Sequence, residues 1–120
     1  GAAIVCDKSR IYIDGELDIH ANREQGSFGY GIWAENDSSI ISNYETINFY
    51  NCTIAVFGDT LSRVFIGSMS GTGTSTVAMK AGKGSFVGTG GIEVDTFTTY
   101  TQTDWTGIII NEINTSDYDA

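Results

Sequence analysis

The stretch IAVFGDTLS (residues 54–62) decides the fold, because the chain repeats its pattern. VAMKAGKGS (77–85) aligns with it without gaps, and the serines that end the two stretches, Ser62 and Ser85, lie 23 residues apart. One step upstream, GIWAENDSS (31–39) aligns in the same way. A repeat of 20 to 50 residues is typical of solenoids, because one unit cannot bury its apolar face without stacking on its neighbours.

Two further copies lie nearer the ends of the chain. GAAIVCDKS (1–9) is a fourth copy and GIIINEINT (107–115) a weaker fifth, and each is offset by 30 residues from its neighbour. We therefore expect the first and last steps to carry about seven extra residues each, beyond a period of about 23.

The repeating unit has the pattern of β-strands. In RIYIDGELDIH (10–20), the apolar residues Ile11, Ile13, Leu17 and Ile19 alternate with polar or outward positions, which is the period of a half-buried strand. Fifteen glycines, no proline and many β-branched and aromatic residues also favour strands over helices. The sequence predicts an all-β protein, a single parallel β-helix of about five coils spanning residues 1–120.

Stacked coils align equivalent residues in columns. We expect a corner column of serines whose hydroxyls bond local backbone groups, formed by Ser9, Ser39, Ser62 and Ser85. The predicted inward columns are Trp33, Val56 and Met79, then Ile54 and Val77, and then Ile11, Ile41, Val64 and Val87.

The same alternation places many large apolar side chains on the outside. They are Tyr12, Ile32, Ile40, Phe57, Phe65 and Phe86. Contiguous exposed apolar area usually marks an interface, so we expect self-association through one flank.

Charge and cysteine content exclude some classes of protein. The 15 acidic and 6 basic residues give a net charge of -9, which repels nucleic acid and anionic membranes. No apolar run approaches the roughly 20 residues of a membrane span. Cys6 and Cys52 lack a CxxC or Cys/His pattern, so buried free thiols are favoured, and a disulfide stays open.

The coil pattern resembles a known family. GIWAENDSS (31–39), NCTIAVFGDTLSRVFIGS (51–68) and KAGKGSFVGTGG (80–91) are similar to the right-handed β-helix of tail fibres and tailspikes of tailed bacteriophages, a branch of the pectin-lyase-like solenoids. The resemblance covers roughly residues 1–115 and rests on the repeat pattern. It implies a homotrimer without cofactors that recognises host surface polysaccharide, either capsule or lipopolysaccharide. It also implies assembly in the host cytoplasm and a place in the virion tail, and we expect the chain to be a fragment of a longer fibre or spike protein.

Paired carboxylates are the candidates for catalysis, because glycoside hydrolysis needs two of them. Glu16 with Asp18, and Glu93 with Asp95, are two residues apart on a strand, which gives a separation of about 6.5 to 7 Å. Acidic residues are common on the wet face of a strand, so we assign no catalytic residue. Asp14, Glu16 and Asp18 also carry oxygen ligands, but no Ca²⁺ loop spacing accompanies them, and we assign no metal site.

The two expansions are better candidates for ligand binding, because insertions in a solenoid emerge as loops on one face. They lie in ANREQGSFGY (21–30) and TTYTQTDWT (98–106). Aromatic rings beside polar groups suit a sugar, and the predicted ligand-binding residues are Arg23, Phe28, Tyr30, Tyr100, Asp104 and Trp105. The alternative is that these loops pack on coil ends or on a neighbouring subunit. Arg63, Lys80 and Lys83 form a local basic patch that either meets an anionic sugar or is simply solvated.

Three functions are consistent with these patterns. The first is a non-enzymatic receptor-binding segment of a phage tail fibre or tailspike that recognises host polysaccharide. The second is a depolymerising tailspike domain, a glycoside hydrolase or lyase with paired carboxylates. The third is a structural stalk or adhesin solenoid. Five coils span only about 24 Å, which is short for a groove that holds several sugars and two catalytic groups.

Overall fold

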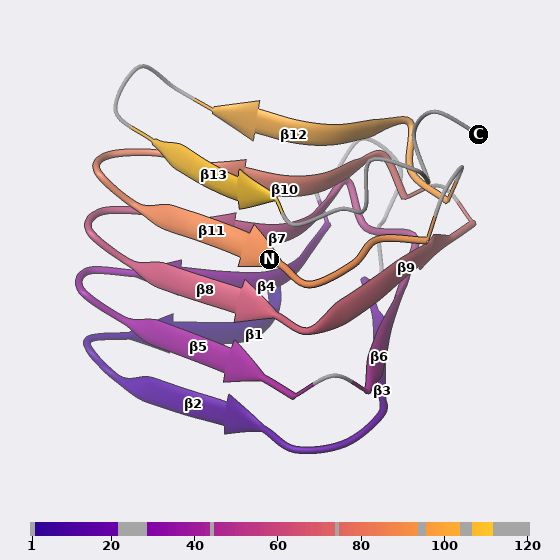
Figure 1. Ribbon diagram of the computed structural model, residues 1–120, viewed down its shortest axis with the longest axis horizontal. Helices are drawn as coiled ribbons and strands as arrows, with labels where there is room; N and C mark the ends of the chain where they lie inside the picture. Colours follow the sequence, from indigo (N-terminus) through magenta and orange to yellow (C-terminus); the bar gives the residue numbers. More distant parts are fainter. Residues whose placement is uncertain are drawn as a thin grey trace.

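A computed structural model of the chain is an all-β solenoid of about four turns, without helices among the residues it describes (Figure 1). The structure describes residues 2–21, 29–43, 45–73, 75–93, 96–103 and 107–111. Each turn contributes strands to up to three stacked sheets, and every strand pairing is parallel. The predicted fold is therefore confirmed, with about four turns where the repeat predicted about five coils.

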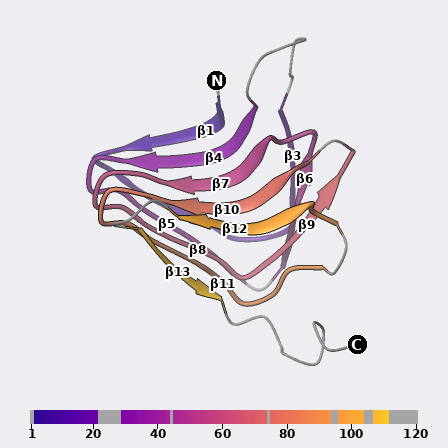
Figure 2. The ribbon, with the colours of Figure 1, turned by 90° about the horizontal axis from the view of Figure 1, so that it is seen from above.

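The three sheets form the sides of the coil (Figure 2). Sheet A consists of β1 (Ala2–Asp7), β4 (Tyr30–Glu35), β7 (Ile54–Gly58), β10 (Val77–Ala81) and β12 (Thr99–Thr103). Sheet B consists of β2 (Arg10–Ile13), β5 (Ser39–Ser42), β8 (Arg63–Ile66), β11 (Phe86–Thr89) and β13 (Ile108–Asn111). Sheet C consists of β3 (Leu17–His20), β6 (Thr46–Tyr50) and β9 (Ser68–Thr72).

The repeat length is close to the predicted one. Paired residues in sheet A are 28, 24, 23 and 22 positions apart, from Ala2 through Tyr30, Ile54 and Val77 to Thr99. The first turn is longer than the others, as expected, and its additional residues fall between β3 and β4.

The predicted second expansion is wrong. Within residues 98–106 the structure describes β12, which pairs with β10 and continues sheet A, where an inserted loop was predicted. Ile108 pairs with Phe86 of sheet B, 22 positions earlier, whereas the predicted fifth copy aligns this segment with β10 of sheet A. Runs of isoleucine suit a strand of any sheet, so composition did not distinguish the two alignments.

The core lies between the three sheets and is built from inward columns of apolar side chains. Each sheet contributes one buried column of three residues. The columns are Ile32, Val56 and Met79 in sheet A, Ile40, Val64 and Val87 in sheet B, and Ile47, Met69 and Ile92 in sheet C and its extension. At the first turn Ile11, Ile13 and Leu17 are half-buried and pack against this core.

The register of the second turn differs from the prediction by one residue. Ile32 and Ile40, expected outside, are fully buried, whereas Trp33 is half-buried and Ile41 is 48% exposed. The reason is the corner, where Ser38 occupies the column position predicted for Ser39. A shift of one residue moves every side chain of a strand to the other face.

The serine column itself is present, and hydrogen bonds explain it. The backbone N–H of Ser9 donates to Ser38 Oγ at 3.2 Å, that of Ser38 to Ser62 Oγ at 3.2 Å, and that of Ser62 to Ser85 Oγ at 3.0 Å. Ser38 Oγ in turn donates to a backbone carbonyl, Glu35 O at 2.7 Å or Cys6 O at 2.9 Å. Each hydroxyl therefore satisfies an N–H of the adjacent turn where the chain leaves one sheet for the next.

The same device occurs at a second corner, between sheets C and A. The backbone N–H of Cys52 donates to Ser75 Oγ at 3.2 Å, and Ser75 Oγ lies 3.0 Å from Thr72 O and 3.1 Å from Phe49 O. The Cys52 thiol is buried, and its Sγ donates to Tyr50 O at 3.6 Å. The Cys6 thiol is buried too, so the favoured prediction of two buried thiols over a disulfide is confirmed.

Candidate functional site

The outer face of sheet A carries a cluster of three aromatic rings, Tyr30, Trp33 and Phe57, which we call the aromatic cluster. Trp33 of β4 pairs in register with Phe57 of β7, and their ring centroids lie 5.5 Å apart. Tyr30 packs on both rings, at 4.9 Å from Trp33 and 5.9 Å from Phe57. All three side chains are half-buried, so part of each ring is open to solvent.

The alternation of the strands explains why the cluster faces outward. Ile32 and Ala34 on either side of Trp33 are fully buried, and so is Val56 next to Phe57. The large aromatic side chains at 33 and 57 therefore stand on the opposite face of the sheet.

A lysine extends the cluster by one turn. Lys80 of β10 pairs in register with Phe57, and its Nζ lies 5.1 Å from the centre of the Phe57 ring. An ammonium at this distance is attracted by the negative face of the ring. At the other end of the same row, Val5 of β1 pairs with Trp33 and is 53% exposed.

One polar atom of the cluster lacks a partner. The Nε1 atom of Trp33 is buried and has no hydrogen-bond acceptor among the described residues. A buried donor without an acceptor costs about 1–3 kcal/mol.

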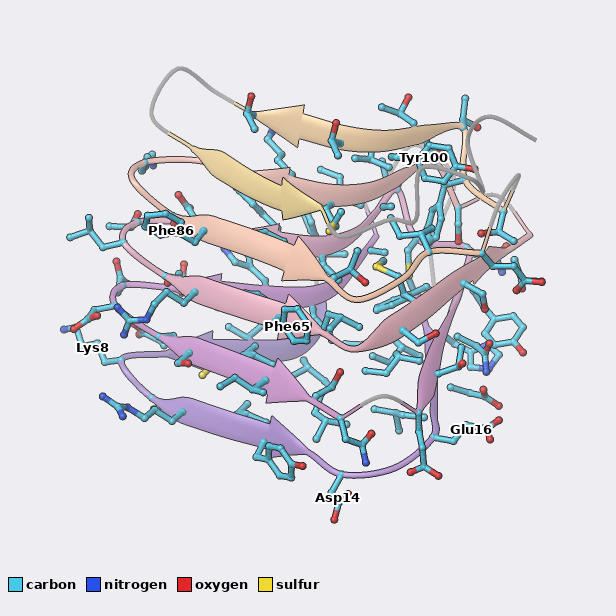
Figure 3. The ribbon with its side chains drawn as sticks, in the orientation of Figure 1. Lys8, Asp14, Glu16, Phe65, Phe86 and Tyr100 are labelled. Carbon is cyan, nitrogen blue, oxygen red and sulfur yellow. The ribbon has the colours of Figure 1, made fainter. Side chains whose placement is uncertain are left out.

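The predicted ligand-binding residues are only partly placed. Tyr30 belongs to the aromatic cluster, while Arg23, Phe28, Asp104 and Trp105 lie outside the described residues. Tyr100 is on β12 (Figure 3) and packs against the core, and no ring contact joins it to the cluster among the described residues. The sequence periodicity does not predict Trp33 and Phe57 as a pair, because without the one-residue shift of the second turn Trp33 aligns with Val56 and points inward.

The candidate catalytic carboxylates are on the surface. Glu16, Asp18 and Glu93 are exposed, and Asp95 lies outside the described residues. Glu16 lies at the first turn of the stack (Figure 3), whereas Glu93 follows the bridge of Ile92 to Met69, so the structure does not bring these two together. Asp18 Oδ1 accepts a hydrogen bond from Asn48 Nδ2 at 3.0 Å.

Sheet C carries polar ladders on its outer face, which the sequence did not reveal. Asn48 bridges Asp18 below and Ser70 above, with Ser70 Oγ donating to Asn48 Oδ1 at 2.6 Å. Beside it, the ring of His20 stacks on that of Tyr50, with centroids 4.2 Å apart and planes within 5°. Both features join side chains of successive turns, and they are explained by strand pairing alone.

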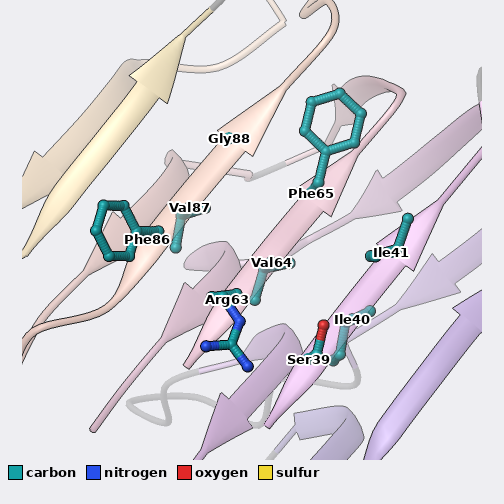
Figure 4. A pocket seen from close by; sticks show the side chains of 9 residues that line it. All are labelled: Ser39, Ile40, Ile41, Arg63, Val64, Phe65, Phe86, Val87 and Gly88. Carbon is teal, nitrogen blue, oxygen red and sulfur yellow. The ribbon is translucent and has the colours of Figure 1, made fainter. Parts of the chain in front are cut away.

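The outer face of sheet B is apolar and hollowed. A groove of about 440 Å³ runs over β5, β8 and β11 (Figure 4). Ile41, Phe65 and Phe86 line its sides, with Ile40, Val64 and Val87 beneath. Tyr12 continues the same face at 64% exposure, so the predicted outward position is confirmed for Tyr12, Phe57, Phe65 and Phe86 and is wrong for Ile32 and Ile40.

The predicted basic patch does not form a single surface. Arg63 Nη2 lies 3.8 Å from Asp37 Oδ1, Lys83 Nζ lies 3.8 Å from Asp59 Oδ1, and Lys80 sits over Phe57. Each of the three cations thus has a different neighbour.

Neither a metal cluster nor a membrane helix is found in the part of the chain that the structure describes. Within it, no three His, Cys, Asp or Glu side chains are close enough together to hold a metal ion. None of its segments is a helix of the length and apolar character needed to span a membrane.

Comparison with known proteins leaves the chain without a family assignment: no protein-family model matches it, and no curated protein or solved structure shows significant similarity to it.

Proposed function

We propose that the chain is a non-enzymatic carbohydrate-binding solenoid, a receptor-binding segment of a phage tail fibre or tailspike that recognises bacterial surface polysaccharide. The aromatic cluster on the outer face of sheet A is the observation that carries this proposal. Three mutually packed, half-buried rings form a rigid apolar surface against which a sugar ring can lie. The assignment to phage tails rests on the resemblance of the repeat pattern.

The groups around the cluster suit a sugar. The ammonium of Lys80, which lies beside the Phe57 ring, supplies hydrogen-bond donors for hydroxyl or carboxylate groups of a saccharide. The rings are pre-organised by mutual packing, which lowers the entropy lost on binding. The described carboxylates offer little for hydrolysis, since Glu16, Asp18 and Glu93 are exposed and Asp18 is already bonded to Asn48.

Binding is tested with oligosaccharides from bacterial capsules and lipopolysaccharides, first on a glycan array and then by titration calorimetry. The variant Phe57→Leu removes a ring and keeps the apolar volume. We expect it to weaken binding roughly tenfold, as loss of one aromatic contact allows. Phe86→Leu is the matched control, because Phe86 lies on the outer face of sheet B, and its affinity should stay unchanged.

Tryptophan fluorescence provides a second readout. The chain has two tryptophans, so a Trp105→Phe background leaves Trp33 as the only indole. We expect its emission to shift to shorter wavelength when a saccharide covers the cluster. Saccharides bound with equal affinity by Phe57→Leu would contradict the proposed site. Release of new reducing ends from the polysaccharide would instead support the depolymerase, and absence of both binding and cleavage would support a structural solenoid.

A further inference from the structure

A row of carboxylates runs beside the aromatic cluster on the outer face of sheet A, where β1, β4 and β7 lie side by side (Figure 2). The row consists of Asp7 on β1, Glu35 on β4 and Asp59 directly after β7. Asp7 pairs in register with Glu35, as Val5 does with Trp33, so the two rows are parallel. Residues two apart on a strand share one face and lie about 6.6 Å apart, which places Glu35 beside a sugar ring that lies over Trp33.

Glu35 carries the free acceptor of this row. Asp7 Oδ1 already accepts a hydrogen bond from Asn36 Nδ2 at 2.9 Å. The Asp59 side chain is 13% exposed, and its Oδ1 lies 3.8 Å from Lys83 Nζ. Glu35 is half-buried between these two, and none of the described residues donates a hydrogen bond to its carboxylate. Its oxygens are therefore available to a molecule that lies on the aromatic cluster.

We propose that the aromatic cluster binds an uncharged saccharide, and that Glu35 selects it by accepting hydrogen bonds from its hydroxyl groups. This inference rests on the proposed function and states which kind of saccharide the site takes. A carboxylate accepts several hydrogen bonds, and those to an ionised group are roughly twice as strong as those between neutral groups. An acidic saccharide brings a second negative charge to the same place, so the carboxylate of Glu35 repels it.

The other charges of the site favour the same class. Lys80 contacts the cluster from its far side, over Phe57 and two strands away from Trp33. Glu35 and Asp7 lie on the side of Trp33 instead. The whole chain has a net charge of -9, so an anion is repelled before it reaches the surface. A hydroxyl group both donates and accepts, so it can bond to the Glu35 carboxylate or to the Lys80 ammonium.

Titration calorimetry with paired oligosaccharides tests the inference. Each pair consists of an oligosaccharide with uronic acids from a bacterial capsule and the same oligosaccharide after reduction of its carboxylates to primary alcohols. We expect the wild type to bind the reduced form roughly tenfold more tightly at low salt, because a like charge close to Glu35 costs energy of that order. The difference should shrink at about 1 M salt, where the Debye length is about 3 Å.

Glu35→Gln keeps the shape of the side chain and removes its charge. We expect this variant to bind the reduced form several-fold more weakly, because a neutral acceptor forms weaker hydrogen bonds, and to bind the acidic form more tightly. Glu16→Gln is the matched control, because Glu16 is an exposed carboxylate outside sheet A and its loss changes the net charge equally. The control should bind both forms as the wild type does, and circular dichroism melts check that both variants fold.

Two results would overturn the inference and leave the proposed function standing. The first is a wild type that binds the acidic form more tightly, with Lys80→Gln removing that preference. The second is equal behaviour of Glu35→Gln and Glu16→Gln towards both forms. In both cases saccharides still bind, and Phe57→Leu still weakens that binding. If the wild type binds neither form, the proposed function and this inference are overturned together.

Discussion

The serine corner and the outer face of sheet B reverse the usual relation between polarity and burial. Ser38, Ser62 and Ser85 have no exposed surface, whereas Ile41 and Phe86 are nearly half exposed. Both sets repeat along the same stack. The difference shows that in a solenoid the position in the coil decides whether a side chain is buried. A corner position needs a buried acceptor for a backbone N–H, so a serine is buried there. An outward strand position stays on the outside whichever residue occupies it.

The largest expected difference is in the free energy of unfolding, between truncating an inner phenylalanine and truncating an outer one. Phe49 is fully buried on sheet C, and its ring occupies the space that Gly31 leaves, since a Cβ added at Gly31 would lie 2.6 Å from Phe49 Cδ1. We expect Phe49→Ala to lower the free energy of unfolding by about 3–5 kcal/mol. Phe86→Ala on the outer face should change it by less than about 1 kcal/mol.

Urea denaturation followed by circular dichroism measures both, at a concentration where the chain is monomeric. Should Phe49→Ala not fold, Phe49→Leu keeps most of the volume and is expected to cost about 1 kcal/mol. Equal losses for the two alanine variants would show that Phe86 belongs to the core and would contradict the assignment of inner and outer faces.

A medium effect is expected for two adjacent serines. Ser38 Oγ accepts the N–H of Ser9 and donates to a backbone carbonyl, so Ser38→Ala leaves buried polar groups without a partner. We expect a loss of about 1–3 kcal/mol in the free energy of unfolding. Ser39→Ala, one position along at the start of β5, should stay within about 0.5 kcal/mol of the wild type. Chemical denaturation of the two variants tests the register, because only the serine at the corner bonds the backbone of the adjacent turn. A larger loss of stability for Ser39→Ala would mean that Ser39 occupies the corner.

The smallest effect is expected for the polar ladder of sheet C. Asn48 is half-buried and joins the exposed Asp18 to the buried Ser70, and its truncation opens a space that water can enter to replace both hydrogen bonds. Asn48→Ala should therefore lower the free energy of unfolding by less than about 1 kcal/mol. Thermal melts against the wild type suffice to check this, and a loss as large as that of Ser38→Ala would place the ladder among the interactions that hold the coil together.

Much of the fold followed from the repeat. The spacing of Ser62 and Ser85, and the columns of Val56 with Met79 and Val64 with Val87, are as predicted. The register of the second turn was not predictable, because Ser38 and Ser39 are chemically identical and only the position of the N–H of Ser9 selects one of them. The last strand could not be aligned from the sequence for a similar reason, since 108–110 is a uniform run of isoleucine.

The candidate site was less accessible from the sequence. Tyr30 was singled out for its place in a predicted loop, but its contacts with Trp33 and Phe57 depend on the pairing of β4 with β7. The groove on sheet B was foreseen only as an excess of outward apolar residues. That Gly88 lines this groove in one row with Phe65 depends on the pairing of β8 with β11.

The amino-acid sequence by itself determined that this chain winds into stacked parallel strands, because a repeated alternation of apolar and polar residues can bury its apolar half only against its own next copy. The tertiary structure alone decided which serine enters the corner, and hence which face Trp33 and Ile41 occupy. The physical reason is that hydrogen bonds between turns select the register, and a single-residue choice at this corner reverses the direction of the side chains in β4 and β5, the strands on either side of it.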